Sequence, residues 1–369
     1  MTRLHELYDR FGQSVWLDNL ERRWLASGEL ARRIEAGVRG ITSNPTIFAK
    51  AMAGSDAYDE QIRAATRSGV PVDVDELFWQ LAQADVGAAA DLFRPVYDAS
   101  GGLDGYVSLE VDPTLASNTE DTVAAARRLY ASLRRPNVYI KVPATPEGVP
   151  AIRQLIGEGI NVNVTLIFSL QRHREVMEAY LAGLEDLRTA GGDVGSVLSV
   201  ASFFVSRVDS EVDRRLEAIG SADATALRGK AAIAQAQVAY QNFRTTFSGS
   251  RWEALAAAGA RPQRPLWAST STKDPSYPDT MYVDELIGPD TVNTMPEATM
   301  TAFEDHGHLE RSVDRDPAAA EATLARLIEV GVDLDDVVEQ LEHEGVAAFA
   351  KSLDEVLDTL GAEVDGLAR

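Results

Sequence analysis

The sequence predicts an α/β protein, a (β/α)8 (TIM) barrel with additional helices and a helical C-terminal segment. Short apolar runs alternate with longer segments whose apolar residues recur at helical spacing, which is typical of βαβ units and a parallel sheet. The runs lack a clean polar alternation, as expected for strands covered on both faces. Eight such runs in 369 residues favour a closed barrel over an open doubly wound sheet. The expected strands span 14–19, 38–45, 105–113, 137–145, 159–168, 196–204, 264–271 and 290–296.

The chain is expected to form one domain, because no repeat, low-complexity tract or linker divides residues 1–369. Two long helical stretches, near 51–104 and 209–263, are interpreted as insertions into the barrel. From about residue 315 onward, leucines and valines at three-to-four spacing predict two or three amphipathic helices. Acidic residues fill the other face, so a packing layer with a solvated side is the favoured interpretation, and a dimer contact is the alternative.

Composition and charge exclude several classes of function. The chain has no apolar run of the roughly 18 residues that a membrane span needs, and its charged N-terminus lacks a signal-peptide core. We therefore expect a cytoplasmic protein without membrane association. A net charge of −22 argues against a nucleic-acid partner. Small phosphorylated substrates are not excluded, because they respond to the local field of a pocket.

Metal and nucleotide sites are not expected. The absence of cysteine excludes disulfides and thiolate ligands, and the five histidines make no zinc pattern. The pair His306 and His308 has the wrong spacing for two ligands on one helix face. The glycines form neither a dinucleotide-binding fingerprint nor a phosphate-binding loop of the nucleotide type. The sequence thus predicts no metal and no cofactor.

Polar residues recur at or near the ends of seven successive predicted strands. A single polar residue in a strand is usually a hydrogen-bonded structural group, but this repetition is harder to explain in that way. In a parallel barrel, reactive groups lie where strands end and loops begin. The residues are Asp18, Asn44, Glu110, Lys141, Asn163, Thr165, Ser202 and Ser269.

Lys141 is the most specific of these signals. It is one of only five lysines against thirty arginines, and it lies inside the apolar run N-V-Y-I-K-V-P. A free amine can attack a ketone to form a Schiff base, whereas a guanidinium effectively cannot. The alternative is a structural lysine paired with Glu110 or Asp18, and the residue pattern leaves both interpretations open.

Asp18 and Glu110 are the two strand-borne carboxylates that could face the same end of the barrel. Carbon–carbon cleavage through an imine needs a base for a hydroxyl proton and a proton shuttle for imine formation. Two carboxylates in different environments could divide these tasks. Either could instead be a plain ion-pair partner.

Two further motifs have both a functional and a structural interpretation. Arg207 with Ser202, and the run S-T-S-T-K ending in Lys273, could bind a phosphate near the last strands. A solvated surface arginine is the alternative there. In T-S-N-P at 42–45, Ser43 or Asn44 could cap a helix that begins near the proline.

Taken together, the motifs resemble those of transaldolases, specifically the longer bacterial type within the class I Schiff-base aldolases. G-I-T-S-N-P-T-I-F at 40–48 and Y-I-K-V-P-A-T-P-E-G at 139–148 are similar to the two family signatures. V-S-L-E-V-D-P, N-V-N-V-T-L-I-F and V-A-S-F-F-V-S-R-V-D follow in the expected order. The resemblance covers about residues 14–300, with little contribution from the C-terminal helices. It implies a (β/α)8 barrel that acts on sugar phosphates without metal or organic cofactor.

The resemblance also implies roles for the residues. Lys141 would form the imine with the ketose C2 carbonyl, and Asp18 would take the C4 hydroxyl proton. Glu110 and Thr165 would hold the water that shuttles protons. Asn44 and Asn163 would bind the dihydroxyacetone unit, and Ser202 and Arg207 would bind the phosphate. Ser108, Phe204 and Ser269 are further substrate-binding candidates.

One departure from the family pattern follows the seventh strand. Many members have Ala-Ser-Phe-Arg there, and this chain has A-S-T-S-T-K at 268–273. The second phosphate-binding arginine is therefore missing, and we hypothesise that Lys273 replaces it.

The expected reaction belongs to the pentose phosphate pathway. A dihydroxyacetone unit would pass from sedoheptulose 7-phosphate to glyceraldehyde 3-phosphate, giving erythrose 4-phosphate and fructose 6-phosphate. The nearest alternative is a lyase that cleaves fructose 6-phosphate, but those relatives tend to be shorter and have tyrosine at the position of Glu110. A sugar-phosphate sensor needs no nucleophile, so Lys141, Asp18 and Glu110 argue against it. A monomer or homodimer is expected.

Overall fold

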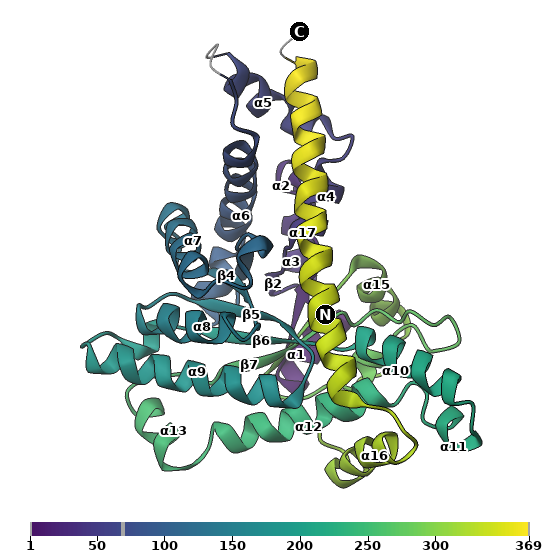
Figure 1. Cartoon of the computed structure of the whole chain (residues 1–369). Helices are drawn as coiled ribbons and strands as arrows, with labels where there is room; N and C mark the ends of the chain where they lie inside the picture. Colours follow the sequence, from purple (N-terminus) through teal and green to yellow (C-terminus); the bar gives the residue numbers. More distant parts are fainter. Residues whose placement is uncertain (1, 68–70, 368–369) are drawn as a thin grey trace.

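The structure is a computed structural model, and it describes residues 2–67 and 71–367. Eight parallel strands close into a barrel in chain order, with β8 paired to β1, which confirms the predicted fold class (Figure 1). Each strand overlaps its predicted run. The strands are β1 Gln13–Leu17, β2 Gly40–Ile41, β3 Tyr106–Glu110, β4 Val138–Pro143, β5 Val162–Ile167, β6 Ser199–Phe204, β7 Arg264–Ala268 and β8 Thr291–Met295.

Helices surround the barrel and cover its mouth (Figure 1). The stretch near 51–104 contains α5 and α6, and α6 packs against β3. The stretch near 209–263 contains most of α10 and all of α11, α12 and α13. The helices are α1 Arg3–Phe11, α2 Arg22–Ser27, α3 Glu29–Glu35, α4 Pro45–Met52, α5 Asp59–Thr66, α6 Val74–Ala99, α7 Thr119–Leu133, α8 Gly148–Gly157, α9 Leu170–Thr189, α10 Ser206–Ile219, α11 Ala222–Thr225, α12 Ala231–Thr246, α13 Gly249–Ala256, α14 Met281–Asp284, α15 Glu297–His306, α16 Pro317–Glu329 and α17 Leu334–Leu367, with short 3-10 turns η1 Asp56–Tyr58, η2 Pro113–Leu115 and η3 Val194–Ser196.

The C-terminal tail forms two helices, within the range that the sequence predicts. The last one, α17, is a continuous helix of 34 residues. It contacts α4, α5, α6, α10 and β5, so it crosses the barrel from one side to the other. Figure 1 shows it in yellow, running from near α16 past the strands to α5. Its buried residues recur at helical spacing, as expected for a packing layer.

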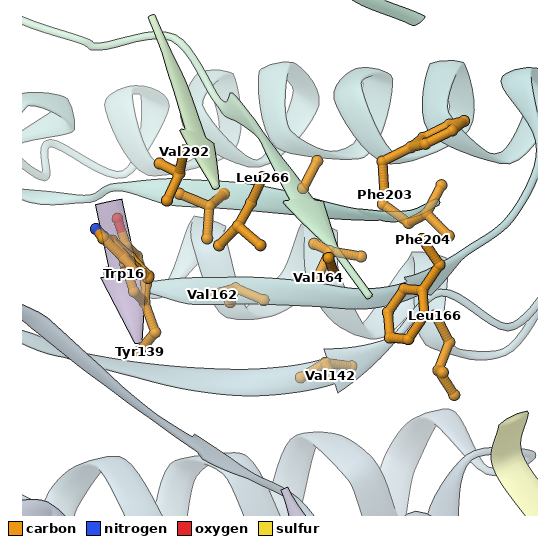
Figure 2. Packing of buried hydrophobic residues seen from close by; sticks show 14 of the residues in the cluster. Trp16, Tyr139, Val142, Val162, Val164, Leu166, Phe203, Phe204, Leu266 and Val292 are labelled. Carbon is orange, nitrogen blue, oxygen red and sulfur yellow. The ribbon is translucent and has the colours of Figure 1, made fainter. Parts of the chain in front are cut away.

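Aromatic side chains fill the barrel near the beginning of its strands. Tyr106 and Tyr139 stack with their ring centroids 4.2 Å apart, and Trp16 lies 6.0 Å from Tyr139. Gly40 makes room for the indole, because a Cβ at that position would lie 2.6 Å from the Trp16 ring. Figure 2 shows Trp16 and Tyr139 at one end of the strands, with Leu166 and Phe204 at the other. The barrel is therefore closed at its base.

The strand register brings the candidate residues to one level. Glu110 of β3 is aligned with Lys141 of β4, and Lys141 is aligned with Asn163 of β5. Glu110 ends β3 and Lys141 lies in the second half of β4, toward the carboxyl ends where parallel barrels carry their active sites, whereas Asn163 lies near the beginning of β5. In the described part of the chain, no helix has the length and apolar character needed to cross a membrane.

Candidate active site

Lys141 and Glu110 form a buried ion pair. The Lys141 Nζ lies 3.1 Å from Glu110 Oε2, and the two residues are only 4% and 3% exposed. A structural lysine was expected to pair with Glu110 or Asp18, and the pair with Glu110 is present. The same contact places an acid–base group beside the amine, which imine formation also requires.

Lys141 is held from a second side by the loop between β2 and α4. Its Nζ donates to the carbonyl oxygen of Ser43 at 3.3 Å, and the Ser43 hydroxyl donates to the Ser108 carbonyl at 2.6 Å. Asn44 caps α4 by accepting from the Ile47 amide at 2.9 Å. The cap interpretation of T-S-N-P is thus confirmed for Asn44. The contact of Ser43 with the lysine was not predicted, because only a backbone carbonyl makes it.

The Glu110 carboxyl has a raised pKa. Burial raises the pKa of its carboxyl, the charge of Lys141 opposes that rise, and the charge of Asp18 adds to it. Among the described residues, the buried Glu110 Oε1 and Thr165 Oγ1 have no hydrogen-bond partner. Buried polar atoms of this kind usually bind ordered water or a ligand. Both residues have the free polar groups that a bound water needs.

Asp18 belongs to the same cluster. The Thr42 hydroxyl donates to Asp18 Oδ1 at 2.7 Å and lies 2.7 Å from the hydroxyl of Thr294. Burial raises the pKa of Asp18. The charge of Lys141 is the largest influence opposing this rise, followed by the Thr42 hydrogen bond. A carboxylate with a raised pKa and a fixed orientation is suited to accept and return a proton. Thr42 was not singled out from the sequence.

A chain of buried hydrogen bonds links three strands inside the barrel. Asn163 Nδ2 donates to Ser108 Oγ at 3.0 Å, and Ser202 Oγ donates to Asn163 Oδ1 at 2.7 Å. The three residues are at most 1% exposed. The chain fixes the orientation of the Asn163 amide. The Ser202 hydroxyl is thus engaged by Asn163.

Two cations lie at the other side of the mouth. Arg207, near the start of α10, has its guanidinium 5.5 Å from the Phe204 ring centroid. Lys273 is exposed in the loop after β7, where its Nζ donates to Ser271 Oγ at 2.7 Å. Partial desolvation of its amine at the barrel mouth lowers the pKa of Lys273, and the charge of Arg207 lowers it further. The exposed Lys50 of α4 also lowers this pKa and was not predicted.

Asp18 interacts electrostatically with both of these cations and with Lys141. It raises the pKa of Lys273, and both Arg207 and Lys273 lower the pKa of Asp18. Ser269, which precedes Lys273 in the loop, lies with its hydroxyl 2.9 Å from that of Ser206 at the start of α10. The predicted site residues in or directly after β1, β3, β4, β5, β6 and β7 thus lie around one mouth.

The backbone is strained at two of these strand ends. Leu166 and Ser269 have φ of 57° and 56°, a region that side-chain-bearing residues avoid. Leu166 directly follows Thr165, where the register of β5 against β6 shifts between Val164 and Ile167. Such strain costs on the order of 1–3 kcal/mol and clusters at functional sites.

Comparison with known proteins gives a family. The family model described as Transaldolase/Fructose-6-phosphate aldolase matches residues 15–360. A transaldolase of Parafrankia sp. (strain EAN1pec) is 55% identical over 97% of both chains. A transaldolase of Thermobifida fusca is 55% identical over 98% of both, and transaldolase 1 of Streptomyces avermitilis is 53% identical over 96% of this chain and 94% of its own.

The family match covers more of the chain than the sequence motifs do. The motifs end near residue 300, whereas the family match continues to residue 360 and includes most of α17. The C-terminal helices are therefore part of the family architecture. This chain belongs to the transaldolase/fructose-6-phosphate aldolase family.

Proposed function

We propose that this protein is a transaldolase that moves a dihydroxyacetone unit between sugar phosphates through an imine on Lys141. The contact of the buried Lys141 amine with Glu110 carries this proposal, since it joins a nucleophile to a proton carrier. The names of the relatives, which are more than half identical over nearly the whole chain, support transfer over simple cleavage. Glu110, where the lyases have tyrosine, supports the same choice.

The first half of the reaction makes an enamine. The Lys141 amine adds to the C2 carbonyl of the donor ketose, a carbon–nitrogen bond forms and water leaves. Glu110 passes the protons of this step through a water that Thr165 helps to hold. Asp18 then takes the C4 hydroxyl proton, the C3–C4 bond breaks, and its electron pair enters the enamine as the aldehyde leaves.

The second half reverses these steps with another aldehyde. The enamine C3 attacks the acceptor carbonyl, Asp18 returns its proton to the new hydroxyl, and water releases the product from Lys141. Arg207 and Lys273 bind the phosphate at the far end of the chain, and Asn44 and Asn163 hold the three-carbon unit. Sedoheptulose 7-phosphate and glyceraldehyde 3-phosphate are the proposed substrates, with erythrose 4-phosphate and fructose 6-phosphate as products.

Borohydride trapping tests this proposal. The protein is incubated with fructose 6-phosphate, reduced, and mapped by mass spectrometry, with and without erythrose 4-phosphate. A three-carbon adduct on Lys141 that disappears when the acceptor is present would establish both the imine and the transfer. Continued release of free dihydroxyacetone in the presence of acceptor would indicate a lyase.

Two variants sharpen the experiment. Lys141→Met should abolish both adduct and turnover, whereas Lys351→Met, which removes a surface lysine from α17, should change neither. Sugar phosphate that binds without any adduct on Lys141 in the unmodified protein would favour a sensor. We further propose one domain, a cytoplasmic location and a monomeric or homodimeric state, the last measurable by light scattering.

A further inference from the structure

The C-terminal helix α17 is fastened across the mouth of the barrel. Gly345 packs so closely on the end of β5 that a Cβ there would lie 3.0 Å from Leu166 Cδ2. Farther along the helix, the Ser352 hydroxyl lies 2.8 Å from that of Thr46 in α4. Arg215 of α10 pairs with Asp336 at 2.7 Å near the beginning of α17. The helix is thus attached to three sides of the site.

Phe349 lies between the first two of these attachment points. Its ring centroid is 5.5 Å from the Lys141 Nζ, and the residue is only 4% exposed. The ring is therefore packed over the reacting nitrogen and is not part of the solvated face of α17. None of the roles assigned above to strand and loop residues uses this side chain.

We propose that Phe349 determines specificity by shielding the three-carbon intermediate on Lys141 from water until an acceptor aldehyde arrives. The inference deepens the proposed transaldolase function and rests on it. A closed apolar cover over a reactive intermediate suppresses its side reactions with water. An aromatic face within about 6 Å of a cation also favours a positive charge, which the imine nitrogen carries when protonated.

The reaction that the ring suppresses can be written in full. When solvent supplies a proton to C3 of the enamine, the enamine becomes an iminium ion. Water then adds to C2, the carbon–nitrogen bond breaks, and dihydroxyacetone leaves with Lys141 restored as the amine. Imine formation released one water and this step consumes one, so the net reaction is cleavage of fructose 6-phosphate into dihydroxyacetone and glyceraldehyde 3-phosphate.

The test measures how the intermediate is partitioned. Phe349→Ala and Phe349→Leu are compared with the unmodified protein, with fructose 6-phosphate as donor and erythrose 4-phosphate as acceptor. The readout is the ratio of free dihydroxyacetone released to sedoheptulose 7-phosphate formed. We expect this ratio to rise severalfold or more in the alanine variant and less in the leucine variant, while the adduct on Lys141 is still trapped by borohydride.

Leu353→Ala is the matched control, because Leu353 lies one turn farther along α17 and is as buried as Phe349. It should lower stability without changing the ratio. An unchanged ratio in folded Phe349→Ala, or an equal rise in Leu353→Ala, would overturn the inference. If the alanine variant does not fold, an unchanged ratio in Phe349→Leu overturns it. If no adduct could be trapped on Lys141 of the unmodified protein, the proposed function itself would be contradicted.

Discussion

At the scale of single residues, the two carboxylates near Lys141 differ in their contacts. Glu110 touches the amine, whereas Asp18 is oriented by Thr42 and influenced by several cations. This difference supports a division of labour in which Glu110 serves imine formation and Asp18 serves cleavage of the C3–C4 bond. The two steps leave different adducts on the lysine, so they can be separated.

Asp18→Asn should therefore stop the reaction between the two steps. The imine with fructose 6-phosphate should still form, but cleavage should slow by about 10²–10⁴-fold because the general base is lost. Borohydride should then trap a six-carbon phosphorylated adduct on Lys141, where the unmodified protein yields a three-carbon one. A three-carbon adduct formed at the unmodified rate would assign the base to another group.

Lys273 is the residue that we propose as a replacement for the missing phosphate-binding arginine. Lys273→Ala should raise the KM for sugar phosphates about threefold to tenfold, as expected for the loss of one exposed charge-assisted contact. The kcat should change little, since the lysine lies away from the reacting carbons. Lys230→Ala serves as the control, because it removes an exposed lysine at the beginning of α12 whose side chain makes no cap hydrogen bond. An unchanged KM in Lys273→Ala would refute the replacement hypothesis.

At the scale of elements, buried carboxylates of α10 fix the loop that carries Lys273. The Tyr282 hydroxyl donates to Asp209 at 2.8 Å, and the Tyr277 hydroxyl donates to Asp213 at 2.6 Å. Asp209 also accepts from the Ala232 amide at 2.8 Å, at the start of α12. The helix that carries Arg207 therefore positions the segment that carries the second cation.

Asp209 makes stability depend on pH. Burial raises its pKa to about 6, so the folded state holds this proton more tightly than the unfolded chain does. Stability should therefore fall as pH rises from about 4 to about 6, by on the order of 2–3 kcal/mol from this group. In Asp209→Asn, the amide oxygen can still accept from the Ala232 N–H, and the amide Nδ2 can donate to the Tyr282 oxygen in place of the present bond. Urea unfolding of this variant across the same pH range should lack that decrease. Parallel pH profiles for the two proteins would contradict the assignment.

The elements differ in how far the sequence predicts them. The strands were predicted because each apolar run is local, and the polar strand-end residues followed because parallel strands share one edge. The contact of Phe349 with Lys141 could not be predicted, since an amphipathic pattern does not say which end of a barrel the helix covers. The contact of Ser43 was missed because a backbone carbonyl leaves no mark in the sequence.

At the scale of the whole molecule, chemistry and stability occupy opposite ends of the barrel. Asp104, just before β3, is buried and pairs with Arg39 at 2.8 Å and with Arg264 at 3.1 Å. Ser14 and the Trp16 indole also donate to it. Burial tends to raise the pKa of Asp104, but the charges of the two arginines outweigh it and hold the pKa below its ordinary value.

Asp104→Ala should destabilise the protein by about 3–5 kcal/mol, because it leaves two arginines without their buried partner. Asp98→Asn, which breaks an exposed pair with Arg94, should cost at most about 1 kcal/mol. The effect of Asp104 should be full at neutral pH, above the unfolded pKa, and should diminish as acid protonates the folded carboxyl.

Urea unfolding of both variants at neutral pH and in acid checks these values. One cooperative transition is expected, since the chain is proposed to form one domain. Folded Asp104→Ala should retain its turnover per molecule, because Lys141 and its partners lie at the other end of the strands. If Asp104→Ala proved no less stable than Asp98→Asn, the buried cluster would not support the barrel. If it lost turnover while remaining folded, the two ends of the barrel would be coupled.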